Sequence, residues 1–369
     1  MIVTKDNYKE VLKCLDSVSD ENSNDVVLDF CSIHRNSIEF VSLIPKVYKF
    51  KNSRHSGRIK LENFDSRYLQ TRDLELPRHL RIEPTTRCNL KCPYCSRNFL
   101  KIAPREDLSF LDFKKIIDNY KTSPDISLWG MGEPLLNSDI FKMVAHAKER
   151  GCRKCDISTN SYFISKENIL LFFTSRLDEL ILAIDGASEE TYLRHRKGGD
   201  FNKVIKNVYQ LCKFKRERGF RRPNIVIQFI VTAYNEQEIP RMRVLSKKLG
   251  VDKLVLKNIS VDGERTHFIP NNIQYNRYGS EVQRSEWCPA LWDSAAISSE
   301  GDVTLCCKMF PIADKVNFGN VFKTDLNSIW NGKEYQYCRK LMLEGKKDQM
   351  EHCDITCPAG QKVVSGEFV

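Results

Sequence analysis

Three cysteines, Cys88, Cys92 and Cys95, lie within one short segment, TRCNLKCPYCSR, directly after a predicted strand. Their CxxxCxxC spacing places three thiols on a single loop. Three thiolates suit a [4Fe–4S] cluster in which the fourth iron stays open to another ligand. Zinc is the alternative metal, but a closed zinc site needs four ligands and the nearby sequence offers no fourth one. The spacing therefore favours an iron–sulfur cluster.

A second group of cysteines lies toward the end of the sequence. Its members are Cys288, Cys306, Cys353 and Cys357. Four thiolates can close a second iron–sulfur cluster with no open iron, and they can also form a zinc site. Cys307 or Cys338 could replace one of the four. We favour iron–sulfur for this second site.

Other cysteines have no clear chemical pattern. The chain has 14 cysteines and no apolar signal segment at its start, so we expect a cytoplasmic protein with reduced thiols. Cys152 and Cys155 form a CxxC pair, which is typical of redox sites. However, the pair falls where a predicted helix ends and a strand begins, so packing is the favoured interpretation.

Composition and charge limit the class of protein. The 369 residues are 41% hydrophobic and 29% charged, which is typical of a globular chain of two or three domains. Lys and Arg exceed Asp and Glu by 58 to 48, but the basic residues are spread along the chain. The excess therefore favours solubility or an acidic partner over nucleic-acid binding. No apolar run is long enough to span a membrane.

The thiols need a scaffold that brings strand ends together, and the sequence predicts one. Between about residues 80 and 256, short β-rich runs alternate with amphipathic helical stretches, which is typical of a parallel α/β sheet. Six βα units are too few for an eight-stranded barrel, so we expect an open or partial barrel with its active face at the carboxyl ends of the strands. Strands are predicted at 80–84, 126–129, 154–158, 179–184, 225–231 and 253–256, and helices at 109–120, 138–150, 201–218 and 236–249.

The chain divides into three predicted domains. Residues 1–75 form an N-terminal accessory module with a helix at 8–17 and strands at 25–30 and 37–43. Residues 76–258 form the core. A Gly, Asn and Pro-rich linker then leads into a cysteine-bearing tail, so that the third domain spans 259–369.

The residues around the thiol loop resemble the radical S-adenosylmethionine (SAM) superfamily. Tyr94 precedes the last cysteine, as in the superfamily's signature. GMGEP, at 130–134, looks like the segment that holds the methionyl amino group of SAM, and STN, at 158–160, looks like the segment that contacts its ribose or carboxylate. The resemblance assigns SAM binding to Tyr94, Gly130, Gly132, Glu133, Pro134, Ser158, Asn160 and Arg196.

The resemblance also implies a mechanism. SAM would chelate the open iron, and a one-electron reductant such as flavodoxin or ferredoxin would reduce the cluster. The reduced cluster would cleave SAM to a 5′-deoxyadenosyl radical that takes a hydrogen atom from the substrate. The protein would orient the reactants in a dry cavity, while the cofactors carry the difficult chemistry.

The tail is similar to SPASM or twitch domains of the same superfamily. The segment FGNVFKTDLNSIW looks like their connecting segment. A full SPASM tail has seven cysteines and two clusters, whereas this tail can close only one set of four. The implied fold is thus a partial (β/α)6 TIM-like barrel with a small N-terminal α+β module and a C-terminal SPASM/twitch-type domain holding one auxiliary [4Fe–4S] cluster.

An auxiliary cluster would accept an electron from the substrate radical, so the implied reaction is an oxidative modification. A base is then needed, and the candidates are Asp185, Tyr234, Lys257 and Asp262. A peptide substrate is slightly favoured. The alternatives are dehydrogenation, epimerisation or decarboxylation of a sugar, aminocyclitol or other small polar metabolite, and an inactive iron–sulfur or zinc-binding regulator.

Overall fold

The computed structural model describes residues 2–4, 6–17, 26–30, 38–51, 59–261, 263–278, 288–314, 316–350, 353 and 365–368. The chain forms two compact units, each of which combines separate stretches. The N-terminal unit contains Met1–Glu75, Ser280–Ser294 and Asn327–Lys362. The sheet unit contains Leu76–Gly279, Ala295–Leu326 and Val363–Val369. The predicted domains were continuous segments, so the structure divides the tail differently.

The sheet unit is built on a nine-stranded sheet with the order β10-β9-β3-β4-β5-β6-β7-β8-β11 in the described part of the chain. Its six central strands are parallel and correspond to the six predicted strands. They are β3 (His79–Ile82), β4 (Asp125–Leu128), β5 (Lys154–Thr159), β6 (Glu179–Ala183), β7 (Asn224–Val231) and β8 (Lys253–Asn258). The expected α/β fold with a mostly parallel sheet is confirmed.

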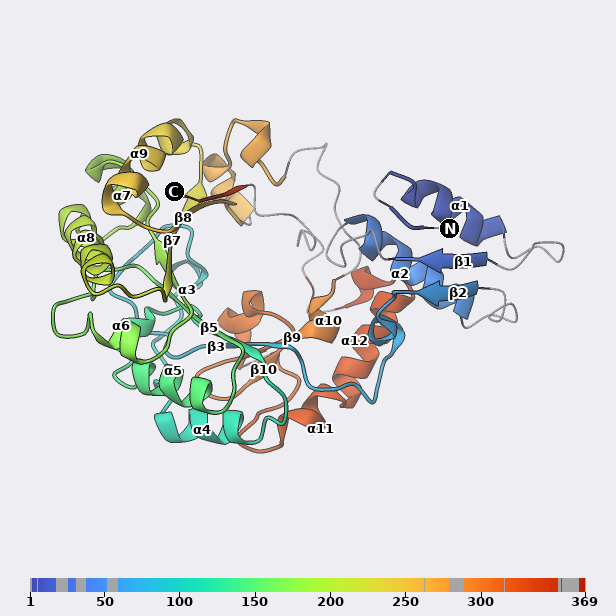
Figure 1. Ribbon diagram of the computed structural model, residues 1–369. Coiled ribbons are helices and arrows are strands. Elements are labelled where there is room, and N and C mark those ends of the chain that lie inside the picture. Colours follow the sequence, from blue (N-terminus) through green and yellow to red (C-terminus); the bar gives the residue numbers. More distant parts are fainter. Residues whose placement is uncertain are drawn as a thin grey trace. The chain divides into compact units, whose positions relative to one another are not determined.

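Helices cover the outer side of this sheet and follow one another around it (Figure 1). They are α4 (Phe110–Asp118), α5 (Ile140–Glu149), α6 (Leu171–Thr174), α7 (Glu189–His195), α8 (Phe201–Glu217) and α9 (Ile239–Leu249). Ser109 caps the first of these helices, because its Oγ accepts a hydrogen bond from the Asp112 backbone N–H at 3.0 Å. Gly250 ends α9 in the left-handed conformation, with φ of 75°, as a helix-terminating glycine should.

Strands from the tail complete both edges of the sheet. β9 (Ser294–Ile297) lies beside β3 and pairs antiparallel with β10 (Val303–Thr304), while β11 (Ser365–Phe368) pairs antiparallel with β8. The Glu83 backbone N–H donates to the carbonyl of Ile297 at 2.9 Å, which extends the β3–β9 contact to the start of the thiol loop. The short added strands cover hydrogen-bonding edges that would otherwise be open.

The inner face of the sheet is polar at β3, β4 and β5. On β3, Leu80 and Ile82 are fully buried, whereas the alternate residues His79 and Arg81 are only half-buried and lie on the opposite face. A chain of hydrogen bonds runs across that face: His79 Nε2 lies 2.8 Å from Ser127 Oγ, which donates to Asp156 Oδ1 at 2.8 Å. A polar inner face is unusual for a packed core and suits a chamber that admits a polar ligand.

The N-terminal unit begins with α1 (Tyr8–Ser17), β1 (Val26–Asp29), α2 (Ile38–Lys51) and β2 (Ile59–Glu62). The predicted helix at 8–17 and strand at 25–30 are present, but the strand predicted at 37–43 is wrong because α2 occupies this segment. β1 and β2 pair in parallel, and parallel neighbours need a crossover connection, which α2 provides. Leu43, Ile44 and Val47 are buried at helical spacing.

Segments of the tail complete this unit through α10 (Ala290–Asp293), α11 (Leu326–Trp330) and α12 (Lys333–Leu343). Arg339 is fully buried and lies over the rings of Trp330 and Tyr335, at 4.4 and 4.9 Å. Its Nε donates to the Leu291 carbonyl at 2.8 Å, and the Trp330 indole donates to the Glu75 carbonyl at 3.0 Å. Early and late parts of the sequence therefore share one core.

Truncating that core should destabilise the N-terminal unit. We expect Trp330→Ala to cost about 3–5 kcal/mol, because the indole is fully buried and supports the Arg339 guanidinium. Tyr337→Ala is the matched control, since this ring on α12 is 55% exposed and should change stability by less than about 0.5 kcal/mol. Chemical unfolding followed by circular dichroism measures both. Equal effects of the two substitutions would contradict this packing.

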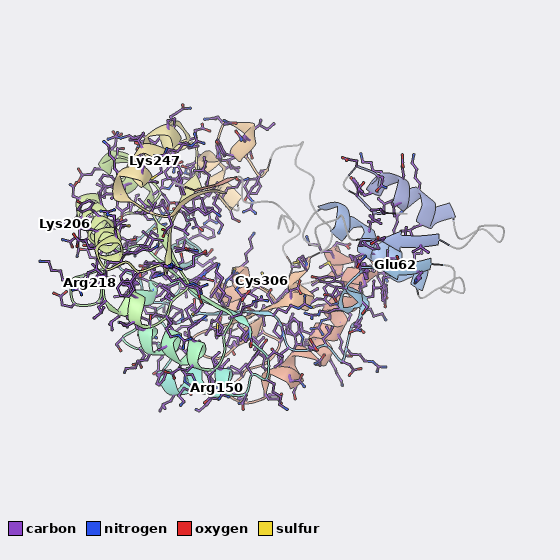
Figure 2. The ribbon with its side chains drawn as sticks, in the orientation of Figure 1. Glu62, Arg150, Lys206, Arg218, Lys247 and Cys306 are labelled. Atoms are coloured by element: carbon purple, nitrogen blue, oxygen red, sulfur yellow. The ribbon has the colours of Figure 1, made fainter. Side chains whose placement is uncertain are left out.

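Basic side chains project from the outer helical layer of the sheet unit. Figure 2 shows Arg150, Lys206, Arg218 and Lys247 there, and all four are exposed. They belong to α5, α8 and α9 or to the C-caps of these helices, and they form no single run. Within the described residues, we find no helix with the length and apolarity needed to cross a membrane.

Candidate active site

The thiol loop leaves the carboxyl end of β3 and ends at the short helix α3 (Ser96–Phe99). Cys95 is the N-cap of that helix, and its backbone N–H donates to the Cys92 carbonyl at 3.2 Å. Cys92 is buried, whereas Cys88 and Cys95 are half-buried. The loop therefore holds one thiol deep in the site and two toward its opening.

The surroundings of the thiols disfavour free thiolates. Burial, opposed by Arg196 and assisted by the neighbouring thiols Cys95 and Cys88, raises the pKa of Cys92 to about 11. Burial also raises the pKa of Cys88. Bound iron would reverse this balance, because a metal deprotonates a ligating thiol. As they stand, no three His, Cys, Asp or Glu side chains of the described residues are arranged to hold a metal ion.

A buried ion pair lies beside Cys92. Arg196 Nη2 is 2.5 Å from Asp185 Oδ2, and Arg196 Nη1 donates to the Cys92 sulfur at 3.9 Å. Asp185 is fully buried and also accepts hydrogen bonds from the Tyr94 hydroxyl, at 3.1 Å, and the Ile230 backbone N–H, at 2.8 Å. Both oxygens of this candidate base are thus already engaged, and in this arrangement Asp185 positions Arg196 and Tyr94.

The GMGEP loop packs backbone to backbone against the thiol loop. A Cβ on Gly132 would lie 2.2 Å from the Thr85 carbonyl oxygen, and one on Gly130 would lie 2.4 Å from Glu83 Oε1. Glu133 N–H donates to the Arg87 carbonyl at 2.8 Å. Glycine is needed at both positions because no side chain fits between the two loops.

Glu133 links the ends of the second and third central strands. It is 2% exposed and accepts hydrogen bonds from Thr159 Oγ1 at 2.6 Å and from the Asn160 backbone N–H at 2.7 Å. The Asn160 side chain in turn donates to Asn89 Oδ1, in the thiol loop, at 2.8 Å. Pro134 begins the turn after Glu133, and Ser158 lies half-buried on β5. The polar strand ends therefore converge on the loop that carries the thiols.

Comparison with known families identifies the two functional parts. Residues 82–244 match the radical SAM superfamily, and residues 288–358 match the SPASM iron–sulfur cluster-binding domain. The chain is a radical SAM protein with a SPASM domain. These domains imply SAM, a [4Fe–4S] cluster that binds it, and auxiliary iron–sulfur chemistry in the tail.

Known proteins resemble this chain in sequence or in fold. A cofactor-modifying protein of the tungsten-containing aldehyde ferredoxin oxidoreductase from Pyrococcus furiosus is 25% identical over 300 residues, which cover 71% of this chain and 83% of that protein. Streptococcus suis SuiB bound to SAM has a TM-score of 0.58 at 20% identity, over 72% of this chain and 68% of that one. The enzyme anSMEcpe with bound SAM has a TM-score of 0.58 at 17% identity, over 73% and 81%.

The residues of the radical SAM domain fit the implied cofactors. Several buried polar atoms beside the thiol loop have no hydrogen-bond partner, namely Asn89 Nδ2, Ser161 Oγ, Tyr192 Oη and Arg196 Nε. Unpaired buried polar atoms are costly and uncommon, so their grouping here indicates a place for a polar ligand. Three thiols, a buried guanidinium and the Glu133 carboxylate match the groups that a cluster and an amino acid-bearing cofactor need.

The SPASM cysteines are only partly described. Cys288 and Cys353 belong to the N-terminal unit and Cys306 to the sheet unit (Figure 2), while Cys357 lies outside the described residues. Cys338 is buried on α12, and burial raises its pKa to about 12, with a contribution from nearby Cys353. Cys307 instead accepts a hydrogen bond from Arg81 Nη1 at 2.8 Å. The assignment of the auxiliary cluster to Cys288, Cys306, Cys353 and Cys357 remains a prediction.

The other candidate bases are scattered. The Tyr234 ring is 40% exposed and lies beneath the Arg194 guanidinium at 5.4 Å. Lys257 Nζ donates to Gln228 Oε1 at 3.1 Å on the inner face of the sheet. Asp262 lies outside the described residues. Of these, Lys257 is the one that lies on the inner face of the sheet, where it contacts Gln228.

Sequence reasoning missed two buried titratable residues of this site. Glu83 is fully buried at the end of β3 and accepts a hydrogen bond from the Met131 backbone N–H at 2.8 Å. His195 is fully buried beside Tyr94, with its Nε2 2.8 Å from Thr232 Oγ1, and burial lowers its pKa to about 4. A carboxylate that directly follows an apolar strand, as in LRIEP, is the signal that could have drawn attention to Glu83.

Glu83 should make stability fall as pH rises. Burial raises its pKa from 4.5 to about 7, so between these values the folded chain keeps a proton that the unfolded chain loses. Glu83→Gln should remove this loss, which amounts to roughly 3 kcal/mol across the window. Glu106→Gln, at an exposed carboxylate, is the control. Urea unfolding from pH 4.5 to 7 tests this, and parallel pH profiles for Glu83→Gln and the unsubstituted chain would refute it.

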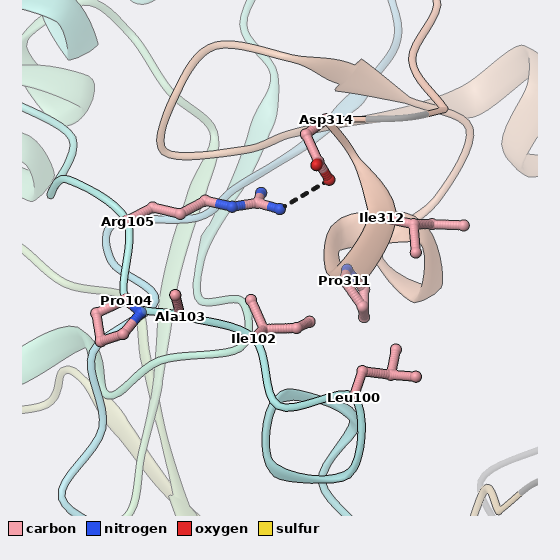
Figure 3. A pocket seen from close by; sticks show the side chains of 8 residues that line it. All are labelled: Leu100, Ile102, Ala103, Pro104, Arg105, Pro311, Ile312 and Asp314. Atoms are coloured by element: carbon pink, nitrogen blue, oxygen red, sulfur yellow. Dashed lines mark hydrogen bonds and ion pairs between the residues drawn. The ribbon is translucent and has the colours of Figure 1, made fainter.

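A pocket of about 390 Å³ lies elsewhere in the sheet unit, between the segment after α3 and the helical turn at Cys307–Ile312. Figure 3 shows Arg105 and Asp314 facing each other across it, with Nη2 and Oδ1 3.0 Å apart. Its other lining residues are Leu100, Ile102, Ala103, Pro104, Pro311 and Ile312. None of them is a predicted site residue, so this pocket is distinct from the cofactor site.

Proposed function

We propose that this radical SAM enzyme oxidatively modifies a peptide within the chamber formed by the inner face of its sheet. The observation that carries the proposal is the convergence of the thiol loop, the Arg196–Asp185 pair and Glu133 at the carboxyl ends of the central strands. Bound SAM and its cluster supply a 5′-deoxyadenosyl radical that takes a hydrogen atom from the substrate.

The residues of the chain orient and shield that chemistry. Cys88, Cys92 and Cys95 would hold the cluster, and Glu133 would accept a hydrogen bond from the methionyl amino group. Arg196 places a positive charge beside the Cys92 sulfur, which suits the carboxylate of the same cofactor. Tyr94 and His195 pack edge to face, with ring centroids 5.3 Å apart, and limit the access of water to the ion pair.

The tail would remove the second electron. Cys288, Cys306, Cys353 and Cys357 would hold a closed auxiliary cluster, which would supply a one-electron acceptor, and a base of the chain would take a proton from the substrate. The net change is the loss of two hydrogens from the substrate. A one-electron donor such as flavodoxin or ferredoxin would start each turnover, and we place the reaction in the cytoplasm.

A peptide is supported by the substrates found in similarly folded proteins. SuiB has been solved with its precursor peptide SuiA and anSMEcpe with a peptide, at TM-scores of 0.53 and 0.56. A small polar metabolite is the second candidate. The Pyrococcus furiosus relative, which this chain covers over 83% of its length, is named for the modification of a cofactor.

The substrate test uses the peptide encoded by a short reading frame next to the gene. Incubated with the reconstituted enzyme, SAM and dithionite, the synthetic peptide should lose about 2 Da, the mass of two hydrogens, and deuterium on the attacked carbon should enter 5′-deoxyadenosine. A gene neighbourhood without such a frame, or a peptide that returns unmodified while SAM is cleaved, would point to the small-metabolite candidate instead.

A further inference from the structure

Arg81 and Lys257 are two cations on the inner face of the sheet, and the proposed function gives neither of them a role. Arg81 is on β3 and Lys257 is on β8, which are the first and the last of the six parallel strands (Figure 1). Both alternate with buried residues, Leu80 and Ile82 on β3 and Leu256 on β8, so both lie on the inner face. Desolvation is the larger cause of a lowered Lys257 pKa, although the side chain is exposed, and the Arg81 charge is the next, so the two cations lie within electrostatic range of each other.

The Arg81 guanidinium is held in place by a ring and a sulfur. It lies over the Trp129 ring at 4.0 Å, and Nη1 donates to the Cys307 sulfur at 2.8 Å. The Nε atom of Arg81 is buried and has no hydrogen-bond partner. A guanidinium fixed by stacking, with a donor left unused, is prepared to bind a planar or tetrahedral oxyanion.

Lys257 adds a second charge to the same region. Its Nζ has one neutral partner, Gln228 Oε1 at 3.1 Å, and its electrostatic neighbours are Arg81, Cys307, Arg277 and Asp185. Asp185 has the weakest of these effects and is already paired with Arg196 at 2.5 Å. Among the described residues, no carboxylate forms an ion pair with Arg81 or Lys257.

Within the described part of the chain, the positive charges of Arg81 and Lys257 are not balanced by an ion-paired carboxylate. The Arg81 guanidinium is half-buried, and its buried Nε without an acceptor is unfavourable, whereas the Lys257 side chain is exposed. The nearby polar groups are Gln228, Cys307 and His79. The nearby carboxylates already have partners, since Asp185 pairs with Arg196 and Asp156 accepts hydrogen bonds from Ser127 and Trp129. Burial lowers the pKa of His79 to about 4, so this histidine is neutral near pH 7. The missing negative charge would therefore come from a ligand.

We propose that Arg81 and Lys257 form a binding site for an anionic group of the substrate, either a carboxylate or a phosphate. The inference rests on the proposed function, because it takes the inner chamber as the place where the substrate lies. The anion would accept hydrogen bonds from Arg81 Nε and Nη1 and from Lys257 Nζ. The Cys307 sulfur accepts the hydrogen bond from Arg81 Nη1 and therefore lies at the proposed site.

Cys307 offers a direct probe of this charge. In the anaerobically reconstituted full-length chain, Cys307 is alkylated either with iodoacetate, which is an anion, or with neutral iodoacetamide, and the rates are read by peptide mass spectrometry. The ratio of the two rates at one thiol is independent of its thiolate fraction. We expect Lys257→Gln and Arg81→Gln each to lower this ratio by about fivefold, as expected for the loss of one nearby charge in a partly screened site.

Lys247→Gln is the matched control, since it removes an exposed lysine of α9 and should leave the ratio unchanged. An equal ratio in the Lys257→Gln and Lys247→Gln proteins would overturn the proposal, and Lys257→Gln keeps the test valid if Arg81→Gln does not fold.

Inorganic phosphate and acetate are then added at fixed ionic strength. Protection of Cys307 by phosphate at the lower concentration identifies a phosphate site, and protection by acetate identifies a carboxylate site. Protection by neither also overturns the proposal.

Formation of 5′-deoxyadenosine is measured on the same unsubstituted samples. A charge-dependent ratio together with no 5′-deoxyadenosine would leave the anion site standing and contradict the proposed function. An unchanged ratio in a protein that cleaves SAM would contradict the anion site and leave the proposed function standing. The two ideas can therefore fail separately.

Discussion

Replacing Cys92 by alanine is expected to abolish 5′-deoxyadenosine formation and to lower the iron content from about eight to about four atoms per chain. Cys92 is the most buried thiol of the loop and lies beside the Arg196 guanidinium, so its loss removes the innermost ligand. Reconstituted protein is assayed for iron, for sulfide and for SAM cleavage products.

Cys212→Ala provides the control for the loss of a buried thiol. Cys212 lies on the buried face of α8, and burial raises its pKa to about 12, which is typical of a packing residue. This variant should keep about eight iron atoms and its SAM cleavage. Full iron content in Cys92→Ala would contradict the assignment of the loop.

Replacing Arg196 by methionine is the second change with a large expected effect. It leaves the Asp185 carboxylate fully buried without its cation, and breaking such a pair typically costs about 3–5 kcal/mol. The substitution also removes the positive charge that would bind the SAM carboxylate. Losing a charge-assisted hydrogen bond of about 3 kcal/mol should lower SAM cleavage by roughly 100-fold. Product formation under saturating dithionite measures the loss.

Two further variants separate a cofactor role from a purely structural one. Arg194→Met changes an exposed arginine two residues earlier and should keep nearly full activity. Arg196→Met combined with Asp185→Asn removes the buried charge, so thermal stability should recover while SAM cleavage stays low. Recovery of both properties in the double variant would show that Arg196 acts only through Asp185 on folding.

Local patterns predicted the elements of the fold well. The six predicted strands correspond to the six parallel strands, and the helix predicted at 109–120 is present as α4, capped by Ser109. These features depend on neighbours in the sequence. The segment at 37–43, which we predicted as a strand, instead forms part of α2. The parallel pairing of β1 with β2 requires a crossover connection, and a local pattern does not show that pairing.

The site was predictable where a motif fixes a loop. Gly132 and Glu133 lie against the thiol loop, as the order of the motifs implied. The partners of Asp185 were not predictable, since Arg196 and Tyr94 approach it from separate segments. The same holds for Cys307, which spacing alone could not distinguish from a cluster ligand and which the fold places against Arg81, 226 residues earlier.

The central claim is that this chain cleaves SAM reductively, and its products test that claim most directly. The anaerobically reconstituted protein, incubated with SAM and dithionite, is analysed for 5′-deoxyadenosine and methionine by mass spectrometry. The account predicts that both products form in equal amounts and that neither forms when dithionite is omitted. A fully loaded protein that yields neither product would contradict it.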